Sequence, residues 1–373
     1  MDNCKVSVIT ITYNQCGYLE RAIKSILAQK VSFEYELIIH DDVSTDSTED
    51  ILKKYESLYP EKIRVIRESE NQYSEGADFF GDIVKNTARG EYIAICEGDD
   101  FWTDDNKLQI QYNALEAHPE CDMCACWGCT VTEDGDREIS QIRPRTGDGI
   151  LTAEDVILGG GQYLVTAGLF FRKSMYNDMK GLGSLDYSMQ MIGALKGGIY
   201  YIDRKMAVYR RYAQGSWTND VLVNDEKLKL QWEKEVELLN TLDKNTGVRY
   251  HEVIIERIKA YTPFEDQLKD HRDEIMTVLS GRKGDIFIWG MGRRGKALQK
   301  YLADLGITVC GVCDAVNENI GGLSACGNKI VTTDYVLENA ATIIASTRFA
   351  YDDLIKSDFA GEILDFQKYM PYG

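Results

Sequence analysis

Acidic residues follow two short apolar runs in the first hundred residues of the chain. Asp41 and Asp42 come after one run, and Glu97, Asp99 and Asp100 come after another. Clustered carboxylates repel one another unless a cation or a proton offsets their charge. Since oxygen ligands favour hard divalent cations, the pattern predicts a Mg²⁺ or Mn²⁺ site, and the metal could hold a diphosphate group.

Each acidic segment also has a local interpretation. Ser47 and Asp50 are spaced like a helix capping box, which would explain these two residues but not Asp41 and Asp42. The segment around Asp99 could be a solvated acidic loop. Because both segments follow predicted strands, where open parallel sheets bind their ligands, together they favour a binding site.

The overall charge narrows the class of ligand. The chain has 373 residues, 42 basic and 60 acidic, which gives a net charge of −18. This charge disfavours a broad nucleic-acid surface but permits a phosphate group held by a metal or by backbone amides. No apolar run approaches the roughly 18 residues of a membrane span, and the N-terminus lacks signal-peptide features. We therefore expect a cytoplasmic protein.

Ten cysteines raise the question of a metal or disulfide framework. Cys121, Cys124, Cys126 and Cys129 are the densest group, but residues 123–131 have the pattern of one strand, whose side chains alternate between two faces. No second Cys/His pair at zinc-site spacing accompanies them. We expect buried, reduced thiols.

The elements that must position the acidic residues alternate along the first hundred positions. Strands are predicted at 6–12, 35–39, 63–66 and 92–96, and helices at 18–29, 48–58 and 78–88. Strands that alternate with helices of this length predict βαβ units and a mainly parallel sheet.

The rest of the chain divides by composition. Residues 1–218 form a first α/β domain, which adds strands at 123–131, 164–171, 199–202 and 206–210 and a helix at 186–195. Residues 219–282 are predicted to be a helical connector, with helices at 225–242 and 251–279 and a break at Pro263. Residues 283–373 form a second, small α/β domain with strands at 285–289, 308–313, 329–331 and 342–345.

Three segments of the first domain carry a family resemblance. They are the run from Val6 to Asn14, the segment from Asp41 to Thr48, and the segment from Gly90 to Asp100. In order and spacing, residues 4 to about 212 resemble a family 2 glycosyltransferase of the GT-A fold. The resemblance implies a nucleotide-diphospho-sugar transferase fold with a Rossmann-like mixed sheet.

The resemblance also implies a donor-nucleotide site. It places Ile11 and Tyr13 beside the nucleotide base, Asp42 on the polar edge of the base, and Asp99 at the ribose. Asp100 would bind the metal. Glu97 stands at the first acidic position of the DxD-type motif of the family, where aspartate is usual, so it is the weaker candidate ligand.

The same resemblance implies a catalytic base. The segment Gly183–Tyr187 matches the family segment that supplies a carboxylate at a helix start, although Leu185 replaces the first of two usual acids. Asp186 alone is therefore the predicted base, which accepts a proton from an acceptor hydroxyl. The alternative is an ordinary helix N-cap.

Two further features could contact the donor. Arg210 and Arg211 could hold the diphosphate or form structural ion pairs. The loop 213–217 combines a glycine with Trp217, as a lid that closes over a sugar would.

The second α/β domain has its own glycine motif. Gly290, Gly292 and Gly295 lie between a predicted strand and a helix, and Asp314 follows the next strand. The domain resembles small Rossmann-like modules of sugar-processing enzymes. Three interpretations stay open: dinucleotide binding, binding of a sugar nucleotide or effector, and a structural or oligomerisation module.

Together these features predict an inverting, metal-dependent glycosyltransferase of the hexosyltransferase type. The resemblance implies a UDP-sugar as the donor. The expected acceptor is a glycan or lipid-linked saccharide of polysaccharide biosynthesis, with at most peripheral association with the inner face of a membrane. One alternative is a nucleotide-sugar oxidoreductase or sensor that uses the glycine motif. The other is a non-catalytic protein that binds sugar nucleotides.

Overall fold

The computed structural model describes residues 4–72, 78–135, 137–178, 181–183, 186–211, 213, 221, 224–280, 282, 285–314, 320–324 and 326–370. By its internal contacts the chain divides into two compact units, Met1–Arg257 and Ile258–Gly373. The division falls inside the segment 219–282, for which a helical connector is expected. The three-part division at 218 and 282 remains a prediction.

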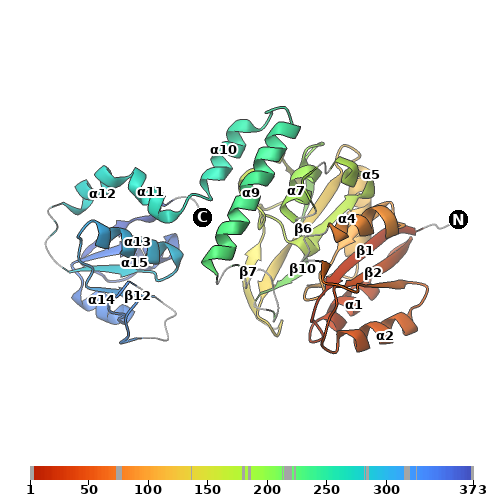
Figure 1. Cartoon of the computed structure of the whole chain (residues 1–373), viewed down its shortest axis with the longest axis horizontal. Coiled ribbons are helices and arrows are strands. Elements are labelled where there is room, and N and C mark those ends of the chain that lie inside the picture. Colours follow the sequence, from red (N-terminus) through yellow and green to blue (C-terminus); the bar gives the residue numbers. More distant parts are fainter. Residues whose placement is uncertain are drawn as a thin grey trace. The chain divides into compact units, whose positions relative to one another are not determined.

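The first unit is built on one large mixed sheet (Figure 1). Its strands are β1 (Cys4–Thr12), β2 (Glu34–Asp41), β3 (Ile63–Arg67), β4 (Tyr92–Ile95), β5 (Phe101–Trp102), β6 (Met123–Val131), β7 (Glu138–Ile142), β8 (Gly149–Leu151), β9 (Leu169–Arg172) and β10 (Ile199–Arg210). The order is β3-β2-β1-β4-β9-β6-β10-β5, with β7 paired to β6 and β8 to β10.

The direction of the strands fixes where the loops of the site meet. Strands β1, β2, β3 and β4 run parallel, and β9 runs antiparallel to both β4 and β6. All four residues of β4 are buried, as expected for a strand that is covered on both faces. Because β1, β2 and β4 run parallel, their carboxyl ends lie at one edge of the sheet.

Helices and short turns connect these strands. They are α1 (Leu19–Leu27), α2 (Thr48–Leu58), α4 (Phe79–Asp82), the π-helix η1 (Ile83–Thr87), α5 (Lys107–Ala117), α6 (Ala153–Gly159), the 3₁₀-helices η2 (Thr166–Gly168) and η3 (Lys173–Asp178), α7 (Asp186–Ala194), α9 (Asp225–Asn245) and α10 (His251–Lys259). The helix predicted at 78–88 is thus a short α-helix followed by a π-helical turn.

Helix α9 and most of α10 belong to the first unit. Leu239, Leu242 and Ile254 are almost completely buried. Arg257 lies 6.0 Å from the ring of Tyr187 in α7. The amphipathic pattern of these helices predicted their existence but not the unit against which they pack.

The second unit has a four-stranded parallel sheet in the order β12-β11-β13-β14. Its elements are α11 (Phe264–Asp270), α12 (Arg272–Leu279), β11 (Ile286–Trp289), α13 (Arg293–Asp304), β12 (Gly311–Cys313), α14 (Thr333–Asn339), β13 (Thr342–Ala345), α15 (Arg348–Lys356), β14 (Glu362–Asp365) and the 3₁₀-helix η4 (Gln367–Tyr369).

Helices cover both faces of this small sheet. Ile286 and Ile288 pack in one apolar cluster with Leu298 of α13, whereas Phe287 packs in a second cluster with Leu354 of α15. The predicted strand at 329–331 is reduced to isolated bridges, and β14 was not predicted. The Rossmann-like assignment of this unit remains a prediction.

Candidate active site

The two acidic segments meet because their strands are parallel neighbours of β1. Thr12 of β1 pairs with Asp41 of β2, and the N–H of Gly98 donates a hydrogen bond of 2.9 Å to the carbonyl of Ile11. Segments that lie more than fifty residues apart in the chain are thereby joined at the same sheet edge.

Asp42 lies directly after β2 and is 2% exposed. Its N–H donates to the carbonyl of Thr12 over 3.1 Å. One of its carboxylate oxygens accepts a hydrogen bond of 2.6 Å from the N–H of Gln72. The carboxylate is therefore engaged by backbone at the position where the resemblance places the edge of a base.

The remaining polar residues of the first segment join two loops. The side-chain oxygen of Asn14 accepts a hydrogen bond of 2.7 Å from the N–H of Thr45, and the N–H of Asn14 donates to the Ser44 hydroxyl over 2.8 Å. The N–H of Cys16 donates to Asp46 over 3.1 Å. These bonds hold the loop after β1, in which Tyr13 is 44% exposed and follows the partly buried Ile11.

Val43 has a left-handed backbone conformation, with φ of +66°. A β-branched residue is sterically unfavourable in this region. Such strain persists only where the surrounding structure enforces it, and it is common at binding sites. Here it lies immediately after Asp42.

The second segment places two aspartates in almost complete burial. Asp99 is 9% exposed and Asp100 is 1% exposed. One carboxylate oxygen of Asp100, Oδ1, accepts a hydrogen bond of 2.9 Å from the N–H of Arg210. Its other oxygen, Oδ2, is buried and has no hydrogen-bond partner among the described residues. A buried carboxylate oxygen that accepts no hydrogen bond is unfavourable unless it binds a proton or a cation.

Burial raises the pKa of Glu97, Asp99 and Asp100, and repulsion between carboxylates adds to the shift at Glu97 and Asp100. Burial, followed by the charges of Asp99 and Asp186, raises the pKa of Glu97 to about 8. Burial is also the main cause that raises the pKa of Asp99 and of Asp100. The charge of Asp186 thus acts on Glu97, although the two residues are far apart in the sequence.

Asp186 is the first residue of α7, and the residue is partly buried. Its carboxylate accepts hydrogen bonds from the Thr166 hydroxyl at 3.2 Å and from the N–H of Tyr187 at 2.7 Å. Burial is the main cause that raises its pKa. The sequence did not predict a role for Thr166, because Asp186, to which it donates, is twenty residues away in the chain.

Arg210 anchors the second acidic segment. The residue ends β10 and is 2% exposed. Its Nε donates to the carbonyl of Asp99 over 2.8 Å, and its Nη1 donates to the carbonyl of Glu133. Burial, followed by the charge of Arg21, lowers its pKa. Much of the guanidinium is thus used within the protein.

Less is known of Arg211 and Trp217, the other two residues predicted to lie near the diphosphate or in a lid. Arg211 is partly exposed, and its N–H donates to the carbonyl of Val131 over 2.9 Å. Trp217 lies outside the described residues.

The carboxylates of the candidate site suit a metal ion whose other ligands are mainly substrate phosphates and water. In the described part of the chain, no three His, Cys, Asp or Glu side chains form a metal site by themselves. Mg²⁺ commonly binds through one or two carboxylates and completes its shell with substrate phosphates and water. The unpartnered oxygen of Asp100 suits that mode.

The glycine motif of the second unit forms a tight loop between β11 and α13. Gly290 has φ of +110°, and a Cβ atom there would collide with the Ser346 hydroxyl. A Cβ atom at Gly295 would collide with the carbonyl of Gly290, whereas Gly292 faces open space. Asp314 accepts a hydrogen bond of 2.8 Å from the N–H of Met291, so its carboxylate engages the loop itself. Ligand binding here remains a prediction.

All ten cysteines are free. The four between residues 121 and 129 are buried, three of them on β6, which has the predicted bounds 123–131.

Comparison with known proteins identifies the family. The model of the family "Glycosyl transferase family 2" matches residues 7–213, more than half of the chain. The chain therefore belongs to glycosyltransferase family 2. The family match and the mixed sheet of the first unit confirm the predicted GT-A fold.

Two curated relatives illustrate the similarity. An uncharacterized protein of Mycobacterium bovis is 35% identical over 213 residues, which is 57% of this chain and 60% of the relative. The putative teichuronic acid biosynthesis glycosyltransferase TuaG of Bacillus subtilis is 42% identical over 106 residues, which is 28% of this chain and 40% of TuaG. The chain thus spans about 60% or less of the length of these relatives.

Among solved structures, S. aureus TarS 1-349 is similar with a TM-score of 0.49 and 15% identity, over 80% of this chain and 79% of that chain. A complex of TarS 1-349 with UDP-GlcNAc gives a TM-score of 0.46 and 16% identity, over 72% of this chain and 87% of that chain. Among the helices that the structure describes, none is both long and apolar enough to cross a membrane.

Proposed function

We propose that this glycosyltransferase is inverting and metal-dependent, and that it transfers a sugar from a UDP-sugar to a glycan or lipid-linked saccharide in polysaccharide biosynthesis. The observation that carries the proposal is the buried carboxylate of Asp100, whose Oδ1 accepts from the N–H of Arg210 and whose Oδ2 has no hydrogen-bond partner among the described residues. A group of buried acids at the carboxyl edge of a sheet suits a cation and a diphosphate.

Each residue of the proposed donor site has a role that its position supports. Ile11 and Tyr13 contact the base, Asp42 binds the polar edge of the base, and Asp99 binds the ribose. Asp100 holds Mg²⁺ or Mn²⁺ through the carboxylate oxygen that has no protein donor, and Glu97 is a weaker candidate ligand. The bound metal supplies positive charge that offsets the charge of the leaving diphosphate.

Asp186 acts as the catalytic base. It accepts the proton of an acceptor hydroxyl while the oxygen of that hydroxyl attacks the anomeric carbon in one displacement, so the configuration inverts. The Thr166 hydroxyl and the N–H of Tyr187 fix the orientation of the carboxylate. The raised pKa makes Asp186 a stronger base than an aspartate in water.

The remaining assignments follow from the resemblance and from relatives. The teichuronic acid assignment of TuaG supports a polysaccharide product. We further propose a cytoplasmic enzyme, peripheral to a membrane at most, in which Arg211 and Trp217 contribute to diphosphate binding or to a lid. The second unit would bind a nucleotide at Gly290, Gly292, Gly295 and Asp314.

The Asp186→Asn variant tests the proposal. Donor binding should change less than about twofold, because the amide keeps the shape of the carboxylate. Turnover should fall by roughly 10²–10⁴, the usual scale of lost acid–base catalysis. The measurements are calorimetric titration with UDP-sugars, with Mn²⁺ or with EDTA, and the rate of release of UDP.

Asp105→Asn is the matched control, since Asp105 pairs with Lys30 at the surface. Near-wild-type turnover of Asp186→Asn would remove the base assignment. Equal affinity for the donor in Mn²⁺ and in EDTA would remove the metal dependence.

A further inference from the structure

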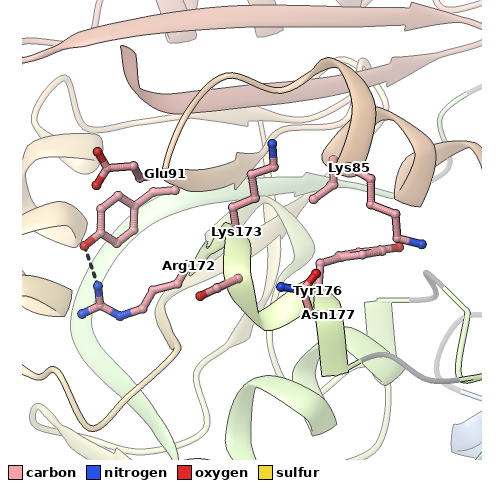
Figure 2. Close-up of a pocket in the computed structure, with 9 residues that line it drawn as sticks. Lys85, Glu91, Arg172, Lys173, Tyr176 and Asn177 are labelled. Atoms are coloured by element: carbon pink, nitrogen blue, oxygen red, sulfur yellow. Dashed lines mark hydrogen bonds between the residues drawn. The ribbon is translucent and has the colours of Figure 1, made fainter. Parts of the chain in front are cut away.

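The first unit has a pocket at the end of the sheet opposite the acidic residues Glu97, Asp99 and Asp100. Its volume is about 560 Å³, and its walls come from η1, the start of β4, the end of β9 and η3 (Figure 2). Tyr92 begins β4, whereas Glu97 and Asp99 follow the other end of that strand. The pocket is therefore separate from the proposed donor site.

The pocket is basic, although the chain carries a net charge of −18. Lys85, Arg172 and Lys173 line it together with a single carboxylate, Glu91. Glu91 is already paired with Lys5, over 2.7 Å. A positive concavity attracts anions, whereas the acidic surface around it repels them. Anions are therefore expected to bind in the pocket rather than elsewhere on the surface.

Two of these cations have no carboxylate partner among the described residues. The ammonium group of Lys85 lies 5.3 Å from the ring centre of Tyr176. The ammonium group of Lys173 donates one hydrogen bond, of 2.6 Å, to the carbonyl of Ala88. Each lysine has three N–H donors, so donors of both remain for a ligand.

The rim that carries Lys85 has an unusual backbone. The N–H of Ala88 donates to the carbonyl of Ile83 over 2.9 Å, five residues back, which closes a π-helical turn around Lys85. Such turns are rare and occur frequently at functional sites. This is a second observation that points to a ligand, independent of the charge.

An aromatic wall completes the pocket. The Tyr176 hydroxyl donates to Asp78 over 3.3 Å, and its ring packs 6.3 Å from Phe80, so the ring is fixed in place. In Figure 2, Lys85 and Asn177 lie beside Tyr176, and Lys173 lies between this group and Arg172. Aromatic faces with nearby polar groups bind sugar rings, and ammonium groups bind phosphate.

We propose that this pocket binds a phosphorylated saccharide, with the phosphate between Lys85 and Lys173 and the sugar ring against Tyr176. The volume exceeds what a free phosphate ion needs and falls within the range of small-molecule sites. The binding does not depend on the proposed transfer reaction.

Calorimetric titration of the full chain tests the proposal, with inorganic phosphate, glucose 1-phosphate and glucose as probes. Glucose 1-phosphate should bind more tightly than phosphate, and glucose should not bind measurably. Lys85→Gln should weaken binding of glucose 1-phosphate about tenfold, the usual scale for one charge-assisted contact. Lys85 is exposed, so this variant should fold normally.

Lys269→Gln is the matched control, because it removes the same charge from an exposed site in the second unit. Saturation with UDP and Mn²⁺ should leave the affinity for glucose 1-phosphate unchanged. The proposal is overturned if Lys85→Gln and Lys269→Gln behave alike, if UDP displaces glucose 1-phosphate, or if phosphate alone binds as tightly. No binding of glucose 1-phosphate at millimolar concentration would also overturn it.

Discussion

At the scale of single residues, the ionised form of the carboxyl groups of Glu97, Asp99 and Asp100 is unfavourable unless a cation binds beside them. Glu97, Asp99 and Asp100 all have raised pKa values, and burial is the main cause for each. Because the pKa of Glu97 is raised to about 8, this carboxyl group keeps its proton at neutral pH without metal, and a cation that binds there must displace that proton. Metal binding should therefore release protons and strengthen as the pH rises.

The shift of Glu97 predicts how stability depends on pH. In the unfolded chain this carboxyl group ionises near pH 4.5, whereas in the folded protein it keeps its proton to about pH 8. The folded state thus binds more protons between these values, and the free energy of unfolding falls as the pH rises through them, by up to about 1.4 kcal/mol per pH unit. Glu97→Gln should remove this part of the slope in metal-free protein, as measured by urea unfolding at pH 5.5 and pH 8.

The exposed Glu61→Gln is the control for this experiment. The assignment fails if Glu97→Gln and Glu61→Gln change the pH slope equally.

The residues of the candidate site could be named from the sequence to different degrees, and their roles remain predictions. The acidic segments could be found from their position after apolar strands, and the family resemblance singled out Asp186. The bonds that hold them could not be found, because Arg210 and Asp100 are 110 positions apart and Thr166 and Asp186 are 20 apart. Local sequence carries no signal for such pairs.

At the scale of elements, β10 is the strand that joins the two halves of the site. It was predicted as two strands, 199–202 and 206–210, because the polar residues between them interrupt the apolar pattern. The structure has one strand with register shifts between Ile202 and Ala207. Irregular pairing lets the strand continue through polar positions and deliver Arg210 to the acidic segment.

Replacement of Arg210 by lysine tests this anchoring. Lysine keeps the main-chain N–H that binds Asp100 but loses the fork that reaches the carbonyls of Asp99 and Glu133. We expect a loss of about 2–4 kcal/mol in the free energy of unfolding, because buried groups lose their partners. Metal-dependent affinity for a UDP-sugar should fall about tenfold, as measured by calorimetry.

Arg204→Lys, on the same strand, is the control, since Arg204 is 53% exposed. Equal effects of the two substitutions would show that the anchor does not matter.

The regular elements were the most predictable. Helix α2 and strand β13 have the bounds that periodicity predicted, and β1 and β2 differ from prediction by a few residues at most. The short strands β5, β7 and β8 were missed, because they depend on pairing with distant partners rather than on their own pattern.

At the scale of the whole molecule, the position of α9 decides where the transferase unit ends. The sequence predicts a helical connector at 219–282, and by its internal contacts α9 groups with the unit Met1–Arg257. The charge of Glu235 in α9 even contributes to the raised pKa of Asp186. Composition alone could not show this, because an amphipathic helix does not specify its partner.

Truncation tests where the unit ends. A chain that stops at residue 262, before Pro263, should fold and bind a UDP-sugar. A chain that stops at residue 218 should aggregate or lose most of its stability, because it lacks Leu239, Leu242 and Ile254, whose burial contributes about 1.5–3 kcal/mol each. Circular dichroism melts and size-exclusion chromatography of both chains provide the measurement. Equal folding of the two would place the boundary at 218.

The π-helical turn at Ile83–Thr87 has one consequence for related chains. A turn closed over five residues holds one residue more than an α-helical turn, and each residue rotates the following side chains by about 100° around the axis. A homologue that lacks a single residue in this segment would regain a regular helix and point the counterpart of Lys85 in another direction. Gain or loss of the basic pocket during evolution could therefore follow from one codon inserted or deleted, without any change in the amino acids that line it.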